Sequence, residues 1–152
     1  MRKHLKRTLA ALLAVVMILA MLPAAVLAAD EAYPVTALKE LPGADQTVVI
    51  YNQSAGGFFG DVAGGSIAPV AAKTTEESPD MLAQTGTNVY KLTANSDGTY
   101  YLMTGGKYLC VDSSEKITLQ DTAVSGTKWK IKAADGYDGY TIVSNDSKYN
   151  GK

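Results

Sequence analysis

The chain has 152 residues, with 14 basic and 15 acidic side chains and a formal net charge of −1. Four of the basic residues and the only histidine lie within the first seven positions, so the chain after residue 28 has 10 basic and 15 acidic residues, a net charge of −5, and neither Arg nor His. This composition argues against a nucleic-acid groove built on arginine contacts, and we expect no nucleic-acid partner.

Residues 1–28 have the three zones of a cleavable secretory signal peptide, which we expect to be helical. A cationic patch is followed by the apolar run 8–22. Val26 and Ala28 then place small residues at the third and first positions before a predicted cut between Ala28 and Ala29. A permanent membrane anchor is the alternative, but it needs about 20 apolar residues without a processing site. We therefore predict a secreted protein, extracellular or at the cell surface, with no membrane contact after signal cleavage.

Catalytic chemistry is restricted by the residue types present. Cys110 is the only cysteine, so no intramolecular disulfide can form; we expect it to be a small buried hydrophobe. After removal of the leader the chain contains no histidine and only one cysteine. It therefore lacks the residues for a zinc site and for a nucleophile–histidine pair. We predict no catalytic residues, no metal, no cofactor and no enzymatic activity in this chain. A small glycosidase that uses two carboxylates is a remote alternative, because nothing in the spacing of the acidic residues singles out a pair.

The remaining 124 residues are enough for one core and have strand chemistry almost throughout. Residues 29–47 are expected to be a lead-in, and 73–80 a surface loop or at most one helical turn. Short runs rich in β-branched and aromatic residues alternate with turn signals such as Gly105-Gly106, which predicts an all-β fold. These runs are at 48–51, 89–92, 99–102, 108–111, 117–119, 129–131 and 140–143.

A weak internal repeat organises these strands. Residues 90–92 (Tyr-Lys-Leu) reappear as 129–131 (Trp-Lys-Ile), and 100–102 reappear as 140–142, with offsets of 39 to 41 residues across the repeat. A fainter earlier copy begins near residue 49. Repeats of this length with about four short strands each indicate a propeller blade or a trefoil lobe, and two and a half copies in one small domain favour the trefoil.

One segment carries a family resemblance. Residues 106–112 (Gly-Lys-Tyr-Leu-Cys-Val-Asp), then 117–120 (Ile-Thr-Leu-Gln) and 127–131 (Thr-Lys-Trp-Lys-Ile), resemble one lobe of a ricin-B-type β-trefoil lectin. Thr127 stands where that family has Gln. The resemblance implies a β-trefoil-like barrel over residues 48–152, a carbohydrate-binding role, and an Asp112 carboxylate that accepts hydrogen bonds from sugar hydroxyls.

The candidate ligand-binding residues are Asp112, Gln120 and Trp129. Asp112 and Gln120 flank one predicted hairpin, where their side chains are expected to converge; as an alternative, Asp112 is an ordinary turn residue. Trp129 is expected to pack in the core, with sugar stacking as the alternative.

The third copy lacks its second half, which predicts a β-trefoil-like domain truncated at its C-terminus, a fragment of a longer protein. The leading hypothesis is a secreted, non-catalytic module that binds a glycan or cell-wall polysaccharide. The alternative is a structural spacer, because the N-terminal region loosely resembles that of large secreted Gram-positive proteins with a metallophosphoesterase or 5′-nucleotidase domain. In that case the partners are downstream domains of the same parent protein, which is itself a hydrolase.

Overall fold

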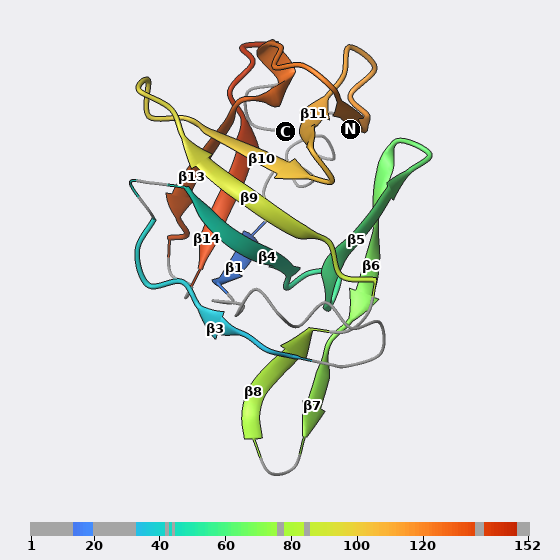
Figure 1. The fold of residues 1–152 in the computed structure, drawn as a ribbon, viewed down its shortest axis with the longest axis vertical. Helices are drawn as coiled ribbons and strands as arrows, with labels where there is room; N and C mark the ends of the chain where they lie inside the picture. The colour runs from blue at the N-terminus through green and yellow to red at the C-terminus, as the bar shows by residue number, and fades with distance from the viewer. Residues whose placement is uncertain are drawn as a thin grey trace, which may run out of the picture.

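The structure is a computed structural model that describes residues 14–19, 33–41, 43, 45–75, 78–83, 86–135 and 139–148. Within these ranges every regular element is a β-strand except one 3-10 turn, η1, at Ser125–Thr127, which confirms the predicted all-β class (Figure 1). The predicted cleavage site between Ala28 and Ala29 lies outside the described residues. So do residues 136–138 and 149–152 near the C-terminus.

Eight of the strands form two four-stranded units. In each unit the first strand pairs with the fourth, and the two strands between them form a hairpin. The first unit contains β4 (Gln46–Asn52), β5 (Gly57–Ala63), β6 (Ser66–Ala71) and β9 (Val89–Ala94). The second contains β10 (Tyr100–Thr104), β11 (Lys107–Val111), β12 (Ile117–Gln120) and β13 (Trp129–Ala133). β14 (Tyr140–Ser144) follows the second unit and pairs with β13.

The polar stretch within residues 73–83 is not the loop or helical turn that its composition predicts. It forms β7 (Lys73–Thr75) and β8 (Ser78–Ala83), which pair with each other and, through β8, with β2 (Tyr33–Pro34). Ala83, the last residue of β8, is buried in one cluster with Val35 and Phe58. This burial favours the strand over the expected loop. The expected lead-in is therefore partly structured.

The leader also departs from expectation, because Ala14–Leu19 form a strand, β1, and not a helix. This strand pairs with β4, with β14 and with the short β3 (Thr36–Ala37). Its β-branched residues Val15, Val16 and Ile18 favour an extended backbone. β1 supplies the backbone partners that the facing edges of β4 and β14 would otherwise lack.

Six strands pair in a continuous circuit, β4–β9–β10–β13–β14–β1 and back to β4. In Figure 1 the blue β1 lies between the teal β4 and the orange-red β14. The hairpins β5–β6 and β11–β12 extend from this circuit as lateral branches.

The pairing register repeats around the circuit. In the first unit, Val48 on the first strand pairs with Tyr90 on the fourth strand. In the second unit, Tyr100 on the first strand pairs with Trp129 on the fourth strand. The next junction repeats too, since Leu92 pairs with Leu102 and Ile131 pairs with Ile142. Leu92 and Ile131, which are 39 residues apart, therefore occupy matching positions in the strand pairing.

The largest core cluster fills the inside of this circuit. Tyr90, Leu92 and Leu102 have no exposed surface, and Trp129 is 5% exposed. Tyr90 and Trp129 are both buried, as the repeat predicts for equivalent residues.

Candidate functional site

The turn of the β11–β12 hairpin is built around Asp112. Its Oδ1 accepts hydrogen bonds from the backbone N–H groups of Ser114 at 2.7 Å and Lys116 at 3.1 Å. The backbone adds Asp112 N–H to Lys116 O, and Glu115 N–H to Asp112 O. Glu115 has a φ of 63°, a left-handed conformation that few residues other than glycine adopt. The Asp112 carboxylate therefore stabilises a strained turn through its Oδ1 atom.

Gln120 lies at the other end of the same hairpin. It pairs with Tyr108, whereas the last pair before the turn is Val111 with Ile117. Four residues separate Asp112 from Tyr108 along the strand, which corresponds to about 14 Å at the usual rise of 3.4 Å per residue. The structure therefore does not bring Asp112 and Gln120 together, and the expected convergence of their side chains is wrong.

The surroundings of Gln120 are polar and aromatic. Its Nε2 donates a hydrogen bond to Thr118 Oγ1 at 3.3 Å. The rings of Tyr101 and its neighbour Tyr108 meet edge to face with centroids 5.2 Å apart, and both residues are partly exposed. Directly paired residues of antiparallel strands share one face of a sheet, so the Gln120 amide lies beside this aromatic pair.

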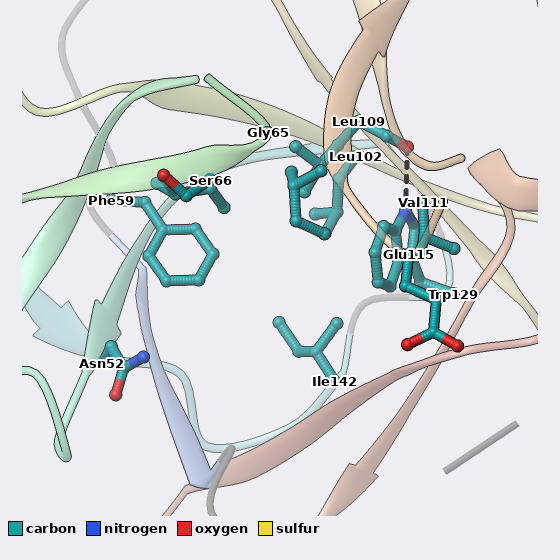
Figure 2. A pocket seen from close by; sticks show the side chains of 12 residues that line it. Asn52, Phe59, Gly65, Ser66, Leu102, Leu109, Val111, Glu115, Trp129 and Ile142 are labelled. Atoms are coloured by element: carbon teal, nitrogen blue, oxygen red, sulfur yellow. Dashed lines mark hydrogen bonds between the residues drawn. The ribbon is translucent and has the colours of Figure 1, made fainter. Parts of the chain in front are cut away.

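Trp129, the third predicted residue, belongs to the interior. Its indole Nε1 donates to the backbone oxygen of Leu109 at 3.0 Å (Figure 2). This bond satisfies the one polar atom of a side chain that is otherwise in the core. The structure thus favours the packing interpretation of Trp129 over sugar stacking.

A cavity of about 320 Å³ lies inside the circuit, at the end that carries the two hairpins. Figure 2 shows Phe59 and Ser66 on one side and Leu102, Leu109, Val111 and Trp129 on the other, with Ile142 between them. The lining is mostly apolar; its polar residues are Asn52, Ser66 and Glu115. The spacing of the strands in the sequence did not reveal this cavity, because it is lined by residues of both units and of β14.

Cys110 is buried in β11, and burial raises the pKa of its thiol, with the carboxylates of Asp112 and Asp146 adding to the effect. A thiol held in its protonated form is a poor nucleophile and a poor metal ligand. Its place in the fold is that of a packed hydrophobe, as the sequence predicts.

Lys128 and Asp97 form an ion pair at 2.6 Å. The ammonium group of Lys128 holds the pKa of the Asp97 carboxyl well below its usual range, and the hydroxyl of Thr99 contributes a further hydrogen bond. The pair joins the turn before β10 to the start of β13. Its location at a junction of the circuit indicates a structural role.

Among the described residues, no group of three or more His, Cys, Asp or Glu side chains is arranged to hold a metal ion. The same part of the chain contains no helix with the length and apolar character needed to cross a membrane. No family model, curated protein or solved structure matches the chain.

Proposed function

We propose that the chain is a secreted, non-catalytic β-trefoil-like module that binds a glycan or cell-wall polysaccharide. The observation that carries this proposal is the repeated register: Val48–Tyr90 and Tyr100–Trp129 are equivalent pairs in two four-stranded units. Repeated four-stranded units around one core are what the resemblance to ricin-B-type lectins leads us to expect.

The β11–β12 hairpin is the proposed binding surface. Only Oδ1 of Asp112 takes part in the turn hydrogen bonds given above, so Oδ2 is available to accept hydrogen bonds from sugar hydroxyls. Gln120 and the Tyr101–Tyr108 pair supply an amide and aromatic faces about 14 Å away. A ligand that contacts both ends must be longer than one sugar ring, which favours an oligosaccharide or polysaccharide. Each end of the hairpin alone offers a shallow binding surface. We therefore expect the affinity of a single site to be on the order of millimolar.

Retention of the secreted protein on immobilised polysaccharides and glycan arrays tests this proposal. Asp112→Asn keeps a carbonyl oxygen for the turn but removes the charged acceptor, so retention should be lost while the circular dichroism spectrum is unchanged. Gln120→Ala should weaken retention, and Asp121→Ala is the matched control, because that exposed carboxylate is paired with Lys107 on the same hairpin. Equal retention of Asp112→Asn and the parent protein would exclude Asp112 from the site.

The spacer function is the second candidate, and one observation favours it. The Asp112 carboxylate already stabilises its own turn, which is sufficient reason for an Asp at that position. Under this proposal the domain positions a downstream metallophosphoesterase or 5′-nucleotidase domain and binds no glycan. Failure of the secreted protein to bind any glycan on the array, with its fold intact, would favour the spacer.

Export has its own test, which is independent of the ligand. The protein recovered from a secreting host should begin at Ala29, because Val26 and Ala28 match the small-residue preference of the signal peptidase. Recovery of a chain that starts at Met1 in the membrane fraction would contradict secretion.

A further inference from the structure

Tyr101, Tyr108 and Gln120 form a row across three neighbouring strands, which we call the tyrosine row. Leu102 is buried in the core, so its neighbours Tyr101 and Met103 face outward from β10. Met103 pairs with Tyr108 on β11, and Tyr108 pairs with Gln120 on β12. The row therefore lies on the outer face of the second unit and is about 10 Å long, at the usual strand spacing of about 4.8 Å.

The two rings of the row are fixed by their surroundings. Both tyrosines are half-buried, and their rings meet edge to face at an interplanar angle of 76°. The buried Gly126 of η1 packs on Cys110, two residues along β11 from Tyr108, so η1 borders the row. Rings held in this way lose little conformational entropy on binding. Their negative faces suit the C–H groups of a sugar ring, which carry a small positive charge.

The lysines that adjoin the row are already paired with carboxylates. Lys91 pairs with Met103 of β10, Lys107 precedes Tyr108 in β11, and Lys128 follows η1. Each contacts an aspartate at 3.1 Å or less, in the ion pairs Lys91–Asp45, Lys107–Asp121 and Lys128–Asp97. Because the positive charge is cancelled locally at these three positions, they hold no spare cation for a carboxylate, sulfate or phosphate group of a ligand.

The turn at the other end of the hairpin is acidic. It contains the partly exposed Asp112 and the exposed Glu115, and the chain after residue 28 has a net charge of −5. A polyanion would be repelled both by this turn and by the domain as a whole. A polycation would be attracted to the turn, but its ammonium groups would then approach the three lysines along the row. The charges therefore favour an uncharged ligand.

A protein partner is disfavoured by the lack of an apolar centre. A protein interface of standard size covers about 800 Å² on each partner and has a hydrophobic core. Among the described residues only Val124 is an exposed large hydrophobic side chain. The tyrosine row is instead bordered by polar groups, since Tyr101 pairs with Thr93 and the Gln120 amide is bonded to Thr118. Such a surface suits a hydroxylated ligand.

We infer that the tyrosine row is a stacking site for an uncharged polysaccharide, whose sugar rings pack on Tyr101 and Tyr108 while a hydroxyl group bonds to the Gln120 amide. This inference rests on the proposed glycan-binding function and narrows its ligand to one chemical class. Stacking and hydrogen bonds to hydroxyl groups are short-range contacts, so binding is insensitive to salt. An anionic cell-wall polymer is not the ligand.

Matched polysaccharides test the class of ligand. Retention of the protein from a secreting host is compared on uncharged polymers, on their carboxylated derivatives, and on the pair chitin and chitosan. Each measurement is made at low salt and in about 1 M NaCl, where charges are screened beyond about 3 Å. We expect retention on one or more uncharged polymers, unchanged by salt, and at least tenfold weaker retention on the charged derivatives of the same backbone.

Variants that keep the bulk of the side chain test the stacking. Tyr101→Leu and Tyr108→Leu remove the aromatic face and should each weaken retention about tenfold. Tyr108→Phe keeps the ring and should lose at most about threefold, the contribution of one hydroxyl group. Tyr51→Leu is the matched control, because Tyr51 also meets a ring edge to face at 5.2 Å but belongs to the cluster of Phe58. It should be retained as well as the parent protein.

Several results would overturn the inference and leave glycan binding intact. They are stronger retention on a charged derivative, loss of retention in salt, and equal retention of Tyr108→Leu and Tyr108→Phe. A dimer in light scattering that both Leu variants dissociate would assign the row to contact between copies of this chain. Absence of retention on every polymer, with the circular dichroism spectrum of a folded protein, would refute the proposed function itself and this inference with it.

Discussion

The indole Nε1 of Trp129 donates a hydrogen bond to the backbone oxygen of Leu109 at 3.0 Å, and this contact ties the fourth strand of the second unit to its hairpin. In the first unit Tyr90 meets Phe59 edge to face, with ring centroids 6.4 Å apart. In both units an aromatic residue of the fourth strand thus packs against the second strand of its own unit. The fold therefore depends on these aromatic residues for the attachment of both hairpins.

Trp129→Phe should destabilise the domain by about 1–3 kcal/mol, because the ring is largely retained but the Leu109 carbonyl loses its buried donor. Trp129→Ala should cost about 3–5 kcal/mol, since it also leaves a large void. Equilibrium urea unfolding measures both values. Near-equal, small losses would mean that the indole is not packed in the core.

The stability of the protein should fall at high pH because of Tyr90. Burial raises the pKa of its phenol to about 12 from an ordinary value of 10, so the folded state keeps a proton that the unfolded state releases. Stability is fully present below pH 10 and is lost as the pH rises toward 12, by about 2–3 kcal/mol for a two-unit difference.

Urea unfolding of the parent protein and of Tyr90→Phe at pH 9 and pH 11 checks this expectation. The variant removes the ionisable group and should lose less stability over that interval. An identical decrease in both proteins would assign the pH dependence to other groups.

Gly126 should be intolerant of any side chain. It is buried in η1, where a methyl group on its Cα would overlap the backbone oxygen of Val111 and crowd the Cys110 sulfur. Gly126→Ala should therefore destabilise the protein by about 1–3 kcal/mol. Gly43→Ala is the control, because no atom of the described residues lies within 4 Å of a methyl group there. Comparable stability of the two variants in urea unfolding would show that η1 does not pack on β11 as described.

The sequence by itself determined the all-β class of the fold. Val48, Tyr100 and Tyr140 begin short β-branched and aromatic runs, and residues of this type favour strands wherever turn residues separate them. The offset between residues 90–92 and 129–131 was visible as a pattern, because equivalent core positions need similar side chains. Burial of Trp129 followed from the same argument, whereas burial of Cys110 followed from its place between Leu109 and Val111.

The tertiary structure alone decided what depends on pairing between distant segments. The separation of Asp112 from Gln120 is a consequence of hairpin register, which composition does not specify. The strands within 73–83 exist because Ala83 packs on Val35 and Phe58, a contact between three separate parts of the chain. The pairing of β1 with both β4 and β14 is likewise a property of the assembled sheet. Local propensity can favour a strand, but only the assembled sheet determines which strands pair.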